Sequence, residues 1–539
     1  MAIRGLKSIV ILAGAGILTG GAATAVLARQ NIVIGEISVH YDHQDRTYDH
    51  TRSVPVDNNG NVVAEDLGTP AAGQSTRVIL LEDRTGDRRD YILTPRLTYS
   101  STGITDTIEL TYAPGVHYDH LDESTDIDQD FGLHAEKNLN RNWLVTLDNR
   151  YFLGDDSLHG NERRTADIVP ASGEAAAPEP TVGSPAAEPD QALTERFGRR
   201  RYWTNTMDIS TDYTYGEDRT FSVGYNFDVL RNDNSDQVGG YTDYDRHTGD
   251  LQLHHRFNRK WSAEGEARYS RGLFDEPDVL VVTPSPTATP PDEETPAVQQ
   301  LTGIDSEDLK EYNFRIRGGY DTSSHYHLFT EYSYLGTDYD SSLRQDSDIH
   351  NVALGFDYDI SQRLHVTLSG GPSWVVRDNS STETDYNAYG GATWDFLHGT
   401  ATVFAGKSYV QDNFDGRGSG LTDSWDTGVT LDYQLTRDLT ATVSANYSHD
   451  QRQQLPLSQT VIVVDQEQPA PAGTVRDEYT EKDYDAGFSL SYTFLRWYTL
   501  SSGYRYYNHD SDLTADGADS YHEHRAFIEL AVSKELFRW

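Results

Sequence analysis

The sequence predicts an all-β fold: a single transmembrane, antiparallel, up-and-down β-barrel of about 20 strands, within a range of roughly 18–22. Three observations predict it. Apolar and polar residues alternate with a period of two, short connections alternate with long ones, and tryptophans fall near the ends of the predicted strands. The 539 residues contain 34 Tyr, 17 Phe, 8 Trp and 44 Gly but no Cys. This composition excludes disulfides and thiolate metal sites and disfavours a helical enzyme.

The N-terminal residues have the pattern of an export signal. Arg4 and Lys7 precede an apolar run at residues 9–18, and small residues follow as far as Ala28. The apolar run is shorter than the roughly 20 residues that a membrane-spanning helix needs. We therefore expect a cleaved signal peptide at 1–28, export to the outer membrane of a Gram-negative cell, and a barrel at 33–539 with no plug domain before its first strand.

The alternation is clearest in residues 221–229, where every odd position is apolar and every even position is small or polar. The same pattern recurs in residues 352–360, 429–435 and 486–494. Soluble β-sandwiches also alternate, so this pattern alone does not indicate a membrane. Twenty strands are predicted, at residues 35–47, 89–101, 104–117, 127–138, 142–154, 200–213, 219–231, 243–257, 260–272, 309–321, 325–339, 346–360, 363–376, 383–396, 399–412, 423–436, 438–450, 478–494, 497–510 and 519–539.

The connections between these strands differ in length in a regular way. Tight turns of a few residues alternate with longer loops, four of which are very long, near 48–88, 155–199, 273–308 and 451–477. Outer-membrane barrels have short periplasmic turns and long extracellular loops. The long loops are acidic and rich in proline. Because they include apolar runs such as 279–282 and 461–464, we expect β-hairpins in some of them.

The tryptophans and the C-terminus support a membrane boundary at both ends of the strands. Outer-membrane barrels carry aromatic girdles at the two lipid interfaces. The final strand ends in Phe537–Trp539, which is similar to the terminal signal read by the barrel-assembly machinery. Lys534 and Glu535 break its alternation, and we expect a bulge there. The turn-side tryptophans are Trp143, Trp261, Trp394, Trp497 and Trp539, and the loop-side ones are Trp203, Trp374 and Trp425.

One block resembles a known family. Residues 90–97 (Asp-Tyr-Ile-Leu-Thr-Pro-Arg-Leu), preceded by His40-Tyr41-Asp42 and followed by 107–118, resemble the type 2 β-barrel porin-like proteins of Gram-negative outer membranes. The resemblance lies mainly in the first third of the chain and carries over no functional residue. It implies a barrel and a pore.

Net charge and missing motifs limit the functional classes. The formal charge of −41 argues against a nucleic-acid partner, since such binding depends on Lys and Arg. The sequence has no nucleophile elbow, P-loop, HExxH or dinucleotide motif, so we expect no catalytic residues, no cofactor and no enzyme activity. The expected function is a porin-like channel for passive diffusion of small polar or ionic solutes. The alternative is a structural barrel that displays its loops or sheathes a secreted cytochrome or exopolysaccharide.

The strand positions that alternate with the apolar ones are the candidate pore-lining positions, and they include residues of both charge signs. Arg268, Arg315 and Arg317 cluster on adjacent predicted strands, where they would face acids across the pore and create a transverse field. The alternative is that these charges are paired or solvated and have no role in selectivity. The candidates are Arg96, Glu109, Arg150, Arg256, Glu266, Arg268, Arg315, Arg317, Glu331 and Arg505.

Histidines gather near the loop side of the first and last strands. His40, His43, His522 and His524 are candidate ligands for a divalent transition metal, because closure of the barrel would bring these strands together. The alternative is ordinary polar decoration of the rim. The acidic loops are candidate sites for divalent cations, including those that bridge lipopolysaccharide phosphates. Outer-membrane lipid and lipopolysaccharide are the other expected partners.

Overall fold

The structure is a computed structural model, and strands with their connecting turns make up nearly all of the residues that it describes. Within those residues, no helix is long and apolar enough to cross a bilayer, a finding that concerns helices only. The described residues are 29–48, 54–56, 75–77, 86–120, 124–154, 201–232, 243–274, 280–282, 298–300, 308–340, 346–377, 382–413, 420–453, 478–512 and 520–539.

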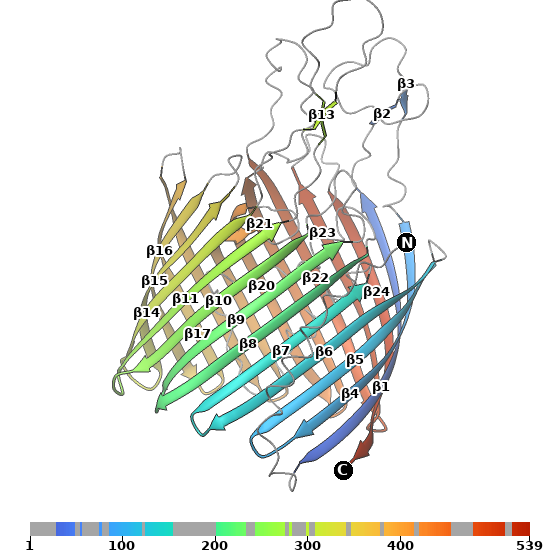
Figure 1. Cartoon of the computed structure of the whole chain (residues 1–539), viewed down its shortest axis with the longest axis horizontal. Helices are drawn as coiled ribbons and strands as arrows, with labels where there is room; N and C mark the ends of the chain where they lie inside the picture. The colour runs from blue at the N-terminus through green and yellow to red at the C-terminus, as the bar shows by residue number, and fades with distance from the viewer. Residues whose placement is uncertain are drawn as a thin grey trace, which may run out of the picture.

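Twenty antiparallel strands form one wall (Figure 1). The strands are β1 (Gln30–Tyr48), β4 (Gly86–Thr102), β5 (Asp106–Asp119), β6 (Ser124–Asn140), β7 (Trp143–Gly154), β8 (Tyr202–Gly216), β9 (Arg219–Asn232), β10 (Tyr244–Arg256), β11 (Trp261–Phe274), β14 (Leu309–Asp321), β15 (Tyr326–Tyr339), β16 (Ser347–Ser361), β17 (Leu364–Arg377), β18 (Glu383–Phe396), β19 (Gly399–Asp412), β20 (Gly420–Thr436), β21 (Leu439–Gln453), β22 (Glu478–Phe494), β23 (Tyr498–Ser511) and β24 (Tyr521–Arg538). The wall is closed, because β1 pairs with the last strand, β24, as well as with the next wall strand in sequence, β4.

The predicted fold class and all twenty predicted strands are confirmed. Strands β14, β18, β19 and β22 have the predicted bounds, whereas β1 begins at Gln30, before the predicted residue 35. The long connections carry two further antiparallel pairs, β2 (Val54–Val56) with β3 (Ser75–Arg77) and β12 (Leu280–Val282) with β13 (Val298–Gln300). The apolar run at 461–464 and the predicted signal peptide at 1–28 lie outside the described residues.

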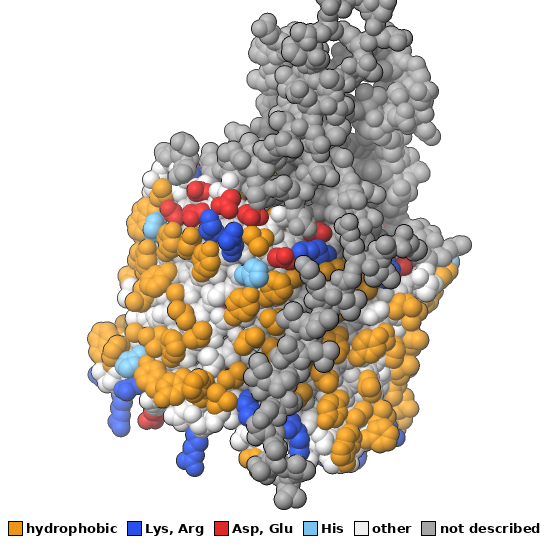
Figure 2. Space-filling view, viewed as in Figure 1, with side chains coloured by type: hydrophobic (Ala, Val, Ile, Leu, Met, Phe, Trp, Pro, Cys, Tyr) orange, Lys and Arg blue, Asp and Glu red, His pale blue; other side chains and the backbone are white. Residues whose placement is uncertain are grey.

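The wall has the reverse polarity of a soluble protein. Large apolar side chains are exposed on its outer face: Leu354 is 69% exposed and Val39 is 54% exposed. On the face shown in Figure 2, apolar side chains cover the wall, while charged side chains gather at its two ends. Six of the tryptophans are also exposed, as expected for interfacial girdles. They are Trp143, Trp261, Trp394, Trp425, Trp497 and Trp539.

The closing contact between β1 and β24 contains the predicted bulge. The register passes from Val33–Phe537 to Ile34–Glu535, so Leu536 has no counterpart on β1. This extra residue restores the alternation beyond Lys534 and Glu535 and leaves Phe537 64% exposed. Backbone hydrogen bonds in both directions between Asn31 and Trp539 complete the closure at the turn side.

Candidate pore lining

All ten candidate pore-lining residues lie on the inner face of the wall. On each strand they have the opposite parity to exposed apolar residues; Phe314 and Ile316, for example, are exposed on either side of Arg315. Strand geometry places such neighbours on opposite faces of the sheet. The placement follows the predicted parity, and a role of these residues in conduction stays a prediction.

Five of these residues form a continuous chain of alternating charge on β11, β14 and β15. Glu266 lies 3.3 Å from Arg268 and 3.3 Å from Arg315, measured between carboxylate oxygen and guanidinium nitrogen. Glu331 lies 3.7 Å from Arg315 and 2.8 Å from Arg317. The acids that contact these arginines therefore lie beside them on the wall. The transverse field across the pore stays a prediction.

The other candidates also have neighbours on the inner wall. Arg256 lies at the turn side, where its guanidinium pairs with Asp218 at 3.2 Å and Asp321 at 2.7 Å. Glu109 is exposed to the lumen and stands opposite Ser100 and His134 in the strand register. The remaining ion pairs are Arg96–Glu36 at 3.5 Å, Arg150–Asp130 at 3.3 Å and Arg505–Asp485 at 2.7 Å.

A row of buried acids near the loop side was missed by the sequence analysis. Asp42, Asp90 and Asp119 stand opposite one another on β1, β4 and β5, and each is 1% exposed. Adjacent like charges repel. The sequence does contain a signal for this row, because His-Tyr-Asp-His occurs both at residues 40–43 and at residues 117–120. Since β1 and β5 both pair with β4, Asp42 and Asp119 both stand opposite Asp90.

Three cationic or imidazole groups offset this row of acids. Arg525 of β24 donates from Nε to Asp42 Oδ2 at 2.8 Å, across the strand pair that closes the barrel. Arg88 Nε lies 3.0 Å from Asp90 and 3.3 Å from Asp119, and His117 Nε2 lies 3.1 Å from Asp90. The row is therefore a charge network spanning β24, β1, β4 and β5.

The four candidate metal-binding histidines divide between the two faces of the wall. His40 lies on the inner face, 5% exposed, with its ring stacked 5.6 Å from the ring of Phe527. His43, His522 and His524 have the outward parity of their strands, and Tyr504 on the outer face contacts His524. Among the described residues, no group of three or more acids and histidines has an arrangement that could hold a metal. A site that needs all four histidines together does not fit this geometry.

Comparison with known proteins gives one family. The family described as putative beta-barrel porin 2 matches residues 293–534. This is the family that the sequence resembles, although the matched range lies in the C-terminal part and not in the first third. No curated protein matches the chain.

Several solved structures are similar to this one at low identity. The siderophore receptor PirA from Pseudomonas aeruginosa has 10% identity and a TM-score of 0.45, with 93% of this chain and 80% of that chain covered. OpdL from Pseudomonas aeruginosa has 10% identity and a TM-score of 0.38, with 94% and 99% covered. Together, the closed twenty-strand wall and the family match identify the chain as a porin-like β-barrel that matches the putative beta-barrel porin 2 family over residues 293–534.

Proposed function

We propose that this protein is an outer-membrane channel for passive diffusion of small polar or ionic solutes. The observation that carries the proposal is the polarity of the closed wall, with apolar side chains exposed outward and the charged residues of β11, β14 and β15 facing inward. Charged side chains on the inside of a barrel are typical of a water-filled pore. Among the described residues, every strand except those of the two short pairs β2–β3 and β12–β13 belongs to the closed sheet. Twenty strands fall between open porins of about 16–18 strands and plugged transporters of about 22.

The proposed solutes are ions and small polar molecules, with a modest preference for cations. The net charge of −41 raises the concentration of cations near the protein. Selectivity within the pore depends on the lining charges. Glu266 and Glu331 favour cations there, whereas their arginine neighbours favour anions.

Current through single barrels tests this function. The purified protein in planar bilayers should give discrete current steps, and a salt gradient should give a reversal potential of the sign expected for cations. Liposomes that contain the barrel should swell in small sugars. If no current and no swelling occur, the proposal fails, and a display or sheath function becomes the better explanation. Co-purification of a secreted haem protein or polysaccharide would support the sheath function.

Removal of one lining charge should change selectivity. Arg315→Gln leaves Glu266 and Glu331 with one fewer cation between them, so we expect a higher permeability ratio of K⁺ to Cl⁻ in reversal-potential measurements. Lys534→Gln is the matched control, because it removes the same charge from the outer face near Trp497. Equal shifts in the two variants would show that Arg315 does not act within the ion path.

The proposed partners are those of an outer-membrane barrel. The exposed girdle suits lipid and lipopolysaccharide. Phe537 and Trp539, 64% and 63% exposed at the end of β24, are available to the barrel-assembly machinery. Divalent cations at the acidic loops, cleavage of the signal peptide and the outer-membrane location are parts of the same proposal.

A further inference from the structure

The pairing between β18 and β19 stops part of the way along the wall. The register joins residues 388–396 of β18 to residues 399–407 of β19 and ends where Ala388 stands opposite Lys407. Nearer the loop side, residues 383–387 and 408–412 are not paired with each other, although β18 stays paired with β17 and β19 stays paired with β20. We call this parting of the two strands the seam.

Beyond the seam, the β19–β20 hairpin lies on the inner side of the wall. The two strands pair without a register shift, so Val403 and Tyr409 share one face of the hairpin. Val403 is 52% exposed on the outer face, whereas Tyr409 is 8% exposed in a buried cluster with Leu335, Ile349 and Val375. Those three side chains belong to the inner faces of β15, β16 and β17, since the exposed apolar positions of these strands have the opposite parity. The hairpin must therefore cross to the lumen side between Val403 and Tyr409.

Polar contacts hold the hairpin at the crossing point. Lys407 forms an ion pair with Asp385 of β18 and lies 3.3 Å from Asp423 of β20. Tyr409 donates its hydroxyl to Asp385 Oδ2 at 3.2 Å. Asp385 stands opposite the buried Ser373 of β17, which places it on the inner face. Contacts from the outward-parity residues of β19 to an inner-face residue of β18 agree with the crossing.

The loop-side end of β19 reaches far around the inside of the wall. Asn413, which follows β19 and is 1% exposed, donates from Nδ2 to Glu311 Oε1 at 2.8 Å and accepts a hydrogen bond from the hydroxyl of Tyr339. Glu311 belongs to β14 and Tyr339 to β15, the fifth and fourth neighbours of β19 in the sheet. A contact across that many strands requires the chain at Asn413 to leave the line of the wall and extend into the mouth of the barrel.

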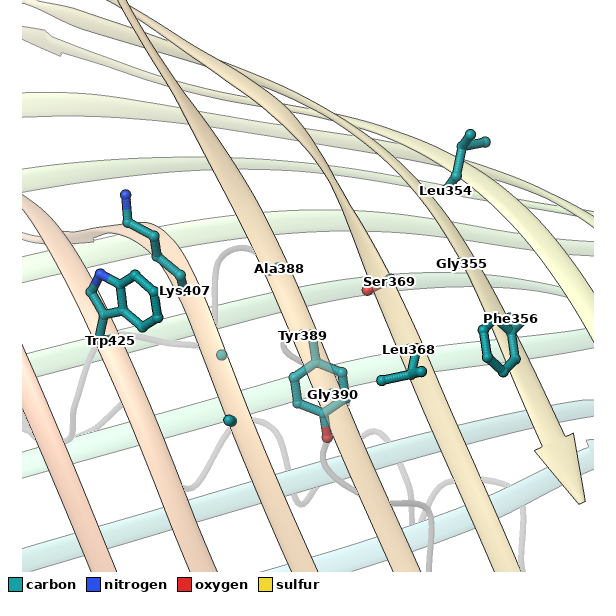
Figure 3. A pocket seen from close by; sticks show the side chains of 12 residues that line it. Leu354, Gly355, Phe356, Leu368, Ser369, Ala388, Tyr389, Gly390, Lys407 and Trp425 are labelled. Atoms are coloured by element: carbon teal, nitrogen blue, oxygen red, sulfur yellow. The ribbon is translucent and has the colours of Figure 1, made fainter. Parts of the chain in front are cut away.

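On the outer face, an apolar hollow of about 580 Å³ lies beside the seam (Figure 3). Leu354, Phe356 and Leu368 line it, and Lys407 and Trp425 lie at one side in the view. This lining suits hydrocarbon chains. The unpaired strand edges lie on the loop side of Lys407, beyond the last paired residues of β18 and β19.

We propose that the described loop-side ends of β19 and β20, residues 408–413 and 420–424, are the constriction element of the pore, held in its narrow position by the Lys407–Asp385 ion pair and the Asn413–Glu311 hydrogen bond. The inference rests on the proposed channel function. A hairpin folded across the mouth occupies cross-section that the solute would otherwise use, so it sets the size limit for permeation. Loss of its polar anchors should favour a wider state.

Conductance tests the constriction. In Lys407→Met/Asn413→Ala, we expect a higher single-channel conductance and faster swelling of liposomes in larger sugars than in the parent protein. Lys407→Arg keeps the positive charge beside Asp385 and should keep the parent conductance. Unchanged conductance and an unchanged size limit in the double variant overturn the proposal.

A thiol assay provides a readout that does not depend on current, because the chain has no cysteine. Val375→Cys places a thiol beneath Tyr409, and Ser501→Cys places one on the inner face of β23, away from the hairpin. With a water-soluble maleimide, Ser501→Cys should react rapidly in every background. Val375→Cys should react slowly in the parent. In the Lys407→Met/Asn413→Ala background it should react about tenfold faster, because loss of a charge-assisted hydrogen bond raises the population of the open hairpin by about that factor.

The two readouts separate the possible failures. If Val375→Cys reacts as fast as Ser501→Cys in the parent background, the hairpin does not cover β17 and the constriction is overturned while the channel stands. If Ser501→Cys is inert and no current flows, the lumen is not water-filled, and both the channel and its constriction are overturned. A faster reaction of Val375→Cys without any change in conductance would show that the hairpin moves but does not limit the pore, which also overturns the proposal.

Discussion

Arg525→Met should destabilise the folded barrel by roughly 3–5 kcal/mol, the usual cost of removing one partner from a buried ion pair. Arg525 and Asp42 are 6% and 1% exposed, and they join β24 to β1, the strand pair that closes the wall. The substitution leaves the charge of Asp42 in a row with Asp90 and Asp119 and without this guanidinium. Urea unfolding in lipid vesicles, followed by heat-dependent gel mobility, measures the change.

Two variants separate the buried charge from general damage to β24. Arg538→Met breaks an ion pair with Glu535 on the same strand, but both side chains are well exposed, so the cost should stay below about 1 kcal/mol. Arg525→Met/Asp42→Asn removes both buried charges and should recover much of the lost stability. A double variant as unstable as Arg525→Met alone would show that packing and not the unpaired charge causes the loss.

The sequence was sufficient to predict the wall, and the physical reason is the two-residue period of a strand. In outer-membrane barrels, lipid outside and water inside impose opposite preferences on successive residues, so each strand can be recognised by itself. Turns of a few residues then fix which strands are neighbours. The bulge at Leu536 was also predictable, because Lys534 and Glu535 interrupt an otherwise regular alternation.

The site could be predicted only in part, because parity gives the face of a residue but not its partner. The parity of Arg315 indicates the inner face, where the structure has it, yet its contacts with Glu266 and Glu331 depend on the register of three strands. The seam depends on tertiary packing: nothing in the alternation of residues 399–412 indicates that Tyr409 packs against the inner face of β17. The alternation within each strand predicts the wall. A strand end that leaves the wall, as β19 does, is determined by contacts between residues far apart in the sequence, which the alternation does not show.

Leu251→Arg and Gln252→Arg should differ strongly in effect, although the two residues are adjacent on β10. Leu251 is 47% exposed on the outer face, where a charged residue at the bilayer midplane costs about 2–4 kcal/mol. Gln252 is exposed with the opposite parity, so an arginine there faces the lumen, which is water-filled in the proposed channel.

Unfolding in lipid vesicles should therefore show a large loss of stability for Leu251→Arg and a change below about 1 kcal/mol for Gln252→Arg. The two variants introduce the same side chain at adjacent positions of one strand. Effects of strand propensity and of barrel assembly should therefore be similar in both and largely cancel in the comparison. Only the medium on each face of the wall differs. Equal losses in the two variants would contradict the assignment of hydrocarbon to the outer face and water to the inner one, and would remove the physical basis of the proposed channel.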